Sequence, residues 1–171
     1  MTIEYKIVEE YPKDVLADLM KRNLEDDQVF IHPDTYLGAG DVNHKRMGKS
    51  VKIAAYDGER IVGVSYGIAI NKHRFMMDIS LVEKEYREQG IYSRMLEMML
   101  ENTREFDEID SCHHQFNNLI IAKKLRSGFH ILSMEIGPAT GSVVRLRYFN
   151  NQKLYSVMRF RTGLIPQTSI V

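Results

Sequence analysis

Hydrophobic and polar residues alternate over several stretches in the first half of the chain, a period typical of β-strands. The pattern predicts strands over Thr2–Glu9, Val51–Tyr56, Arg60–Ile70 and Phe75–Val82. Asp57-Gly58 is a hairpin turn signal between the second and third of these strands. After the first strand, Pro12 suits the first position of a helix, and apolar residues at helical spacing extend that helix to about Leu24.

The second half of the chain changes between helical and strand periods. Apolar residues at helical spacing predict a helix over Gly90–Arg104 and another that Asn117 or Asn118 caps and Gly128 ends. Alternation predicts further strands over Glu108–His113, Phe129–Ile136 and Val143–Phe149. For residues 151–162, a helix and a strand are both open. The order of elements predicts one α/β domain over residues 1–171, with a mostly antiparallel N-terminal sheet and later βαβ units.

Composition narrows the class of protein. The 171 residues are 44% hydrophobic, and 23 Lys and Arg balance 23 Asp and Glu, which disfavours a nucleic acid partner. Cys112 is the only cysteine, so no internal disulfide can form. The N-terminus has no apolar core of signal-peptide length, and no stretch is apolar enough to span a bilayer. We expect a cytoplasmic protein without membrane contact, as a monomer or a homodimer.

The turn after the fourth predicted strand suggests a phosphate site. Met76–Val82 runs into Arg87-x-x-Gly90, and a helix follows. The first N–H groups of a helix have no intrahelical partner, and glycine lets a phosphate approach the backbone closely. The segment matches neither a P-loop nor a Rossmann fingerprint. An ordinary loop glycine is the alternative that this segment alone leaves open.

Two segments together resemble the GNAT family of N-acetyltransferases. Val82-Glu-Lys-Glu-Tyr-Arg-Glu-Gln-Gly-Ile91 resembles its acetyl-CoA motif, a valine followed by Arg/Gln-x-x-Gly-x-Gly/Ala. Asn117 to Phe129, ending Arg126-Ser-Gly-Phe129, resembles its second helix and the start of the next strand. The resemblance extends from about Ile3 to Phe149. It implies a mixed, mostly antiparallel central sheet flanked by helices on both faces, and acetyl-CoA as the acetyl donor.

The resemblance also implies roles for residues that match its motifs. Arg87 would add charge or hold the loop. Backbone groups of Ser80, Leu81 and Val82 would face the pantetheine arm and the thioester, where two strands splay apart. Asn117 or Asn118 would touch the pantetheine. Backbone N–H groups would wrap the pyrophosphate at Glu88, Gln89, Gly90, Ile91, Tyr92 and Ser93.

The chain departs from the family pattern at two positions. Tyr92 stands where a small residue is expected, so its side chain must point away from the phosphates. Lys124 stands where many members have a tyrosine that acts as general acid, and a lysine can donate a proton there only if its pKa is lowered.

Acetyl transfer to an amine also needs a base. The candidates are Asp78, Glu83, Cys112, His113 and His114. Neighbouring strand residues face opposite ways, so the last three of these cannot share one metal ion, and no metal site is expected. Arg145 and Arg147 share a strand face, either as solvated side chains or as groups that recognise an acidic acceptor.

These features predict an enzyme that transfers acetyl from acetyl-CoA to a primary amine of a small molecule or peptide by direct attack, with Asp78, His113 and Lys124 as catalytic candidates. One alternative is a non-catalytic acyl-CoA-binding module, and another is a nucleotide-phosphate binder. The loops Asp26–Lys49 and Gly137–Gly141 are expected to shape the acceptor site.

Overall fold

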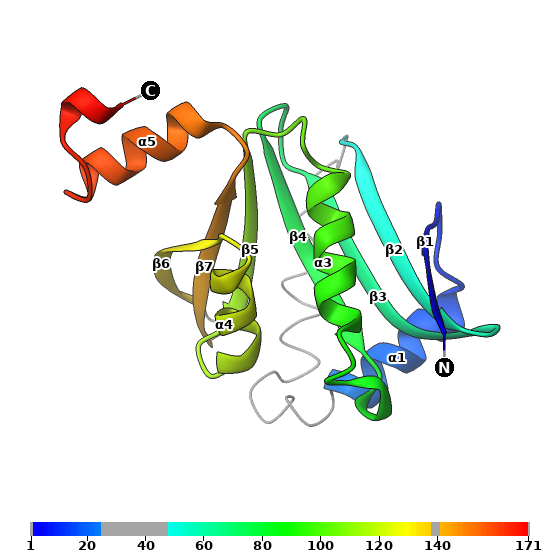
Figure 1. Ribbon diagram of the computed structural model, residues 1–171. Helices are drawn as coiled ribbons and strands as arrows, with labels where there is room; N and C mark the ends of the chain where they lie inside the picture. The colour runs from blue at the N-terminus through cyan, green and yellow to red at the C-terminus, as the bar shows by residue number, and fades with distance from the viewer. Residues whose placement is uncertain (1, 25–47, 138–140, 171) are drawn as a thin grey trace.

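The computed structural model describes residues 2–24, 48–137 and 141–170 (Figure 1). Most of the predicted loop 26–49 and the centre of the predicted turn 137–141 therefore lie outside the described residues. The strands are β1 (Ile3–Ile7), β2 (Ser50–Asp57), β3 (Arg60–Ala69), β4 (Arg74–Val82), β5 (Glu108–His114), β6 (His130–Gly137) and β7 (Gly141–Phe149). The α-helices are α1 (Lys13–Leu24), α3 (Ile91–Glu101), α4 (Asn118–Arg126) and α5 (Gln152–Arg161), and two short 3-10 turns are η2 (Lys84–Tyr86) and η3 (Gln167–Ser169).

The strands form one mixed sheet in the order β1-β2-β3-β4-β5-β7-β6. Neighbouring strands are antiparallel except for β4 and β5, which are parallel. A parallel pair needs a crossover connection, and α3 provides it here. The predicted fold class, a mostly antiparallel sheet with helices on both faces, is confirmed.

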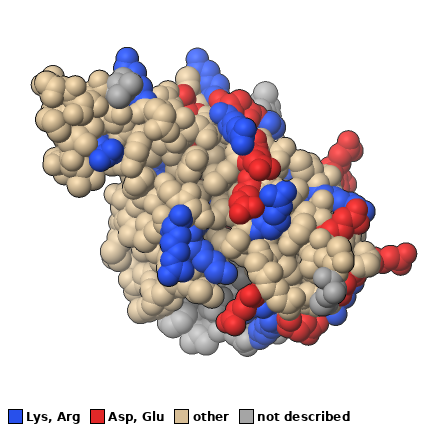
Figure 2. All heavy atoms as spheres, in the orientation of Figure 1, with Lys and Arg blue, Asp and Glu red and all other residues tan. Residues whose placement is uncertain are grey.

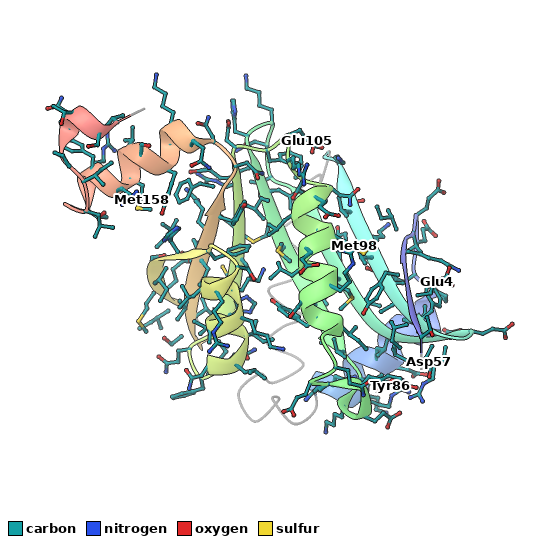
Figure 3. The ribbon with its side chains drawn as sticks, in the orientation of Figure 1. Glu4, Asp57, Tyr86, Met98, Glu105 and Met158 are labelled. Carbon is teal, nitrogen blue, oxygen red and sulfur yellow. The ribbon has the colours of Figure 1, made fainter. Side chains whose placement is uncertain are left out.

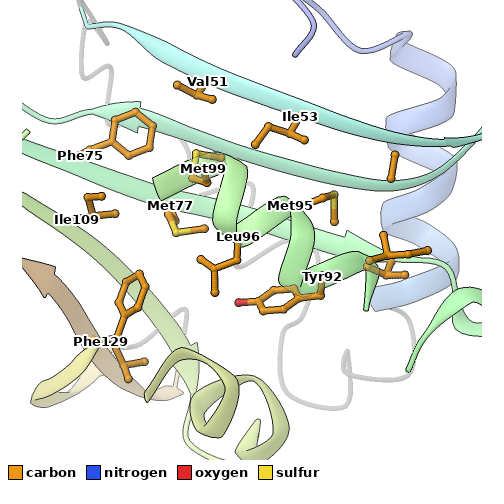
Figure 4. Packing of buried hydrophobic residues seen from close by; sticks show 14 of the residues in the cluster. Val51, Ile53, Phe75, Met77, Tyr92, Met95, Leu96, Met99, Ile109 and Phe129 are labelled. Carbon is orange, nitrogen blue, oxygen red and sulfur yellow. The ribbon is translucent and has the colours of Figure 1, made fainter. Parts of the chain in front are cut away.

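Two apolar clusters attach the helices to the two faces of the sheet. The larger lies under α3 and α4, and Met95, Leu96 and Met99 of α3 are buried in it (Figure 4). The smaller joins Leu19 of α1 to Ile61 and Val64 on the other face. The α3 stripe predicted from helical spacing is therefore the face that packs on the sheet.

The last segment is a helix, which settles the alternative left open for residues 151–162. The side chain of Asn151 accepts hydrogen bonds from the N–H groups of Lys153 and Leu154, the geometry of a helix N-cap. The helix α5 projects from the sheet, and none of its residues is buried (Figure 1). Among the described residues, no helix has both the length and the apolar character needed to cross a membrane.

Asp110 is a buried carboxylate that holds the arginines of β7. Arg147 donates to its Oδ1 at 2.6 Å and to its Oδ2 at 2.9 Å, and Arg145 lies 3.4 Å from Oδ2. Arg147 also pairs with Glu108 at 2.6 Å. These arginines are thus engaged within the sheet, rather than forming the solvated face that was one expectation. On the face shown in Figure 2, basic and acidic side chains are intermixed.

We expect Asp110→Ala to destabilise the fold by ~3 kcal/mol, because it removes the fully buried partner of the Arg147 guanidinium, which then retains only its ion pair with Glu108 among those the described residues make. Urea unfolding followed by circular dichroism measures this change. Glu135→Gln is the control, because Glu135 also pairs with Arg145 but is exposed, and such pairs contribute ~1 kcal/mol or less. Equal effects of the two variants would contradict the assignment of Asp110 as the centre of this network.

Candidate functional site

The strands β4 and β5 separate partway along their length. They pair from Arg74 opposite Glu108 to Met77 opposite Ser111, and the pairing ends there. Beyond this point β4 continues alongside β3 as far as Val82, and Figure 1 shows β4 and β5 diverging. Ser80 and Leu81, which were predicted to face the pantetheine arm, lie half-buried on this diverging part of β4.

A β-bulge lies at the point of divergence. Tyr66 of β3 pairs with Ile79 and Gly67 pairs with Met77, so Asp78 is the extra residue of β4. A bulge bends its strand and increases the local twist. As the extra residue of the bulge, Asp78 explains why β4 separates from β5. Its charge did not predict this structural role.

The amino end of α3 is an open helix end, in the sense that no side chain caps it among the described residues. Its N-cap is Gly90, with φ 83°. The first intrahelical bond recorded there runs from the N–H of Arg94 to the Gly90 carbonyl at 3.0 Å, so the N–H groups before it have no acceptor within the helix. A Cβ built on Gly90 would meet nothing within 4 Å. Glu88 also has a positive φ, 64°, an uncommon conformation that is concentrated at ligand-binding loops.

Side chains of α1 and of the loop itself hold the loop before α3. Arg87 donates to the Val82 carbonyl at 3.1 Å and to Oδ1 of Asn23 in α1 at 2.9 Å. Arg87 thus holds the loop, one of the two roles expected for it. Glu83, one of the candidate bases, is buried and accepts from Arg22 at 2.6 Å. Asn23 gave no signal in the sequence, because its role depends on a contact between distant segments.

The far side of this loop is fastened to the β2–β3 turn. The hydroxyl of Tyr86 donates to Oδ2 of Asp57 at 2.8 Å, and Figure 3 shows the two side chains together at one end of the sheet. Contacts on both sides therefore hold the turn.

Lys124 is a buried amine on α4. It is 1% exposed, and its Nζ lies 2.8 Å from the sulfur of Met77 and 4.2 Å from the centre of the Phe129 ring. Met77 is the last residue of β4 that pairs with β5, so the amine lies where the strands part. Burial lowers the pKa of Lys124 to about 7. The condition set by the sequence, a lowered lysine pKa, is met.

His113 lies near Lys124, on the α4 side of β5. Its Nε2 shares a hydrogen bond of 2.7 Å with Oγ of Ser111. Burial, and then the charge of Lys124, lower the pKa of His113 to about 4. The ring is therefore neutral near pH 7 and a weak base.

Cys112 lies on the opposite face of β5 from His113, as strand alternation requires. Burial raises the pKa of its thiol, opposed by Arg145, and the negative charges of Glu135, Asp110 and Asp78 raise it further. Asp78 thus lies on the Cys112 side of the sheet, and Lys124 on the other. A pocket of about 130 Å³ on the Asp78 side is lined by Tyr11, Lys52, Val64, Tyr66 and Ile79.

Tyr92 points into the core, away from the open helix end, as its size required. The residue is 7% exposed, and its hydroxyl is buried without a hydrogen-bond partner among the described residues. Lys123 of α4 lies over its ring at 5.7 Å.

Asn117 caps α4 by accepting from the N–H of Ile120 at 3.4 Å, and Asn118 is the first residue of that helix.

Neither a protein-family model nor a curated protein sequence matches this chain. Solved structures do match this chain in their fold. A GNAT-family acetyltransferase from Staphylococcus aureus is 14% identical, with a TM-score of 0.69 and coverage of 87% of this chain and 99% of the other. An acetyltransferase from Bacillus subtilis in complex with CoA is 15% identical, with a TM-score of 0.63 and coverage of 86% and 99%.

A GNAT-family acetyltransferase from Elizabethkingia anophelis with acetyl-CoA bound is 12% identical, with a TM-score of 0.59 and coverage of 86% of this chain and 97% of the other. The alignments thus span nearly the whole of each neighbour, and what they share with this chain at such low identity is the arrangement of elements. This chain has the fold of the GNAT-family acetyltransferases.

Proposed function

We propose that this chain is an N-acetyltransferase that moves an acetyl group from acetyl-CoA to a primary amine of a small molecule or peptide, acting as one cytoplasmic domain. The observation that carries the proposal is the relative position of three features. The open amino end of α3 directly follows the diverging part of β4, and a buried amine lies where β4 leaves β5. An anion site, a free strand edge and a proton donor therefore follow one another along a single path.

The residues present fit coenzyme A. The N–H groups from Glu88 to Ser93 suit its pyrophosphate, because Gly90 leaves them accessible. Ser80, Leu81 and Val82 lie on the part of β4 that has lost β5, where the pantetheine arm can pair like a strand. Asn117 and Asn118 stand at the start of α4. The bound CoA and acetyl-CoA in two structural neighbours support this assignment.

When bound, acetyl-CoA supplies the acetyl group as an activated thioester. Lys124 is the proposed general acid, giving a proton to the sulfur as it departs, because a donor with a pKa near the working pH is the most effective. Asp78, on the opposite side of the sheet, is the proposed acceptor-side base. His113, with its lowered pKa, is too weak a base to take that role at neutral pH.

Calorimetry with acetyl-CoA tests the cofactor. We expect binding at micromolar concentrations, and a folded protein that shows no binding at high micromolar acetyl-CoA would overturn the proposal. Thiol release across a panel of amines then tests the chemistry. Binding without turnover favours the non-catalytic module, whereas competition by ATP but not by CoA favours a nucleotide-phosphate binder.

A further inference from the structure

The hydroxyl of Tyr92 is a polar group in an apolar setting. The ring leaves the first turn of α3 and lies beside Leu96, within the cluster that also holds Phe129 (Figure 4). The hydroxyl oxygen is fully buried and has no protein partner among the described residues. Buried polar groups in folded proteins nearly always have a partner, so an unpaired one calls for a ligand or a functional reason.

The Tyr92 side chain lies between α3 and α4. Lys123, which is on α4, lies over the tyrosine ring at 5.7 Å, so the ring occupies the side of α3 that faces α4. The neighbouring Lys124 contacts Met77 where β4 and β5 part. Tyr92 is thus on the side of α3 that faces the path from the open helix end to the divergence of the strands.

We propose that the Tyr92 hydroxyl donates a hydrogen bond to an amide carbonyl of the pantetheine arm of coenzyme A, an inference that rests on the proposed function. The arm is the part of the cofactor that must reach from the helix end to Lys124, and its amide oxygens are acceptors. The phosphates are assigned to the N–H groups around Gly90, whereas the Tyr92 ring lies beside Leu96 of the next helical turn (Figure 4). Burial also raises the pKa of Tyr92, so the phenol remains a donor at neutral and alkaline pH.

The test compares wild-type protein with Tyr92→Phe, which removes only the hydroxyl. Calorimetry measures affinity for CoA and for adenosine 3′-phosphate 5′-diphosphate, the ADP half of CoA, which keeps the pyrophosphate and lacks the arm. We expect the variant to bind CoA about tenfold more weakly, the loss of one hydrogen bond to a buried group, and to bind the ADP half as wild type does. Its melting temperature without ligand should equal or exceed that of wild type, because no hydrogen bond within the protein is lost.

Tyr11→Phe is the matched control. The hydroxyl of Tyr11 donates to the carbonyls of Ser65 at 2.7 Å and Ile53 at 3.1 Å on the other side of the sheet. This variant should melt at a lower temperature and bind CoA normally, which is the opposite pattern.

Three results would overturn the inference while the proposed function stands: unchanged CoA affinity in Tyr92→Phe, a rise in that affinity, or an equal loss for CoA and its ADP half. The last would assign the effect to the helix end. If wild-type protein binds no CoA, the proposed function itself fails, and the inference falls with it.

Discussion

Replacing Lys124 with methionine is expected to stabilise the protein and to slow acetyl transfer. Methionine has a similar length and no charge, and the site is 1% exposed beside Met77 and Phe129. Replacing a buried ionisable group by an apolar one of similar volume is commonly neutral or stabilising, and we expect a gain of ~2 kcal/mol near neutral pH. Urea unfolding measures this gain.

The dependence of stability on pH provides a second readout for Lys124. In the unfolded chain the lysine stays protonated up to about pH 10, whereas in the folded protein burial lowers its pKa to about 7. Between these values the unfolded state binds more protons, so the free energy of unfolding rises with pH. Below about pH 7 the stability conferred by the neutral amine is lost. Lys124→Met should remove this slope.

Turnover should change in the opposite direction from stability. Loss of a general acid costs about a hundredfold in kcat, and the decline of kcat above about pH 7 should disappear in Lys124→Met. Arg126→Met, which removes an exposed cation from the same helix, is the control and should keep both activity and the pH profile. A Lys124→Met variant with wild-type kcat would show that another group protonates the sulfur.

Gly90→Asp is expected to abolish binding of CoA at ordinary concentrations. The aspartate would place a negative charge at the N–H groups proposed to hold the pyrophosphate, at a position where the added side chain meets nothing. Like charges brought together cost several kcal/mol, so we expect affinity to fall at least about a hundredfold. Calorimetry with CoA and with adenosine 3′-phosphate 5′-diphosphate should show the same loss, because both ligands carry the pyrophosphate.

Gly58→Asp provides a closely matched control for this variant. Gly58 in the β2–β3 turn also has a positive φ, 59°, and open space around its Cβ position. Both substitutions should cost ~1 kcal/mol or less of stability from backbone strain. Only Gly90→Asp should lose CoA binding, and equal binding by the two variants would remove the helix end from the site.

Hydrophobic periodicity was enough to locate the strands and all the α-helices of the described residues except α5. Alternation marks the strands because successive side chains face opposite sides of a sheet, and the spacing in Gly90–Arg104 marks one helix face. The ends were less accurate, since α3 ends at Glu101. Residues 151–162 stayed ambiguous until the Asn151 cap was seen, because a short helix without a buried face leaves a weak pattern.

The sequence by itself also determined where a cofactor motif stands, since Gly90 and the turn before α3 are local features. Only the tertiary structure shows that β4 leaves β5 at Asp78, that Arg87 is held by Asn23, and that the Tyr92 hydroxyl is buried with no partner in the part of the chain that the structure describes. The reason is physical: bulges, ion pairs and burial depend on contacts between residues far apart in the chain. The lowered pKa of Lys124 depends on its surroundings in the same way, because β4, α4 and β6 must assemble before the amine is removed from water.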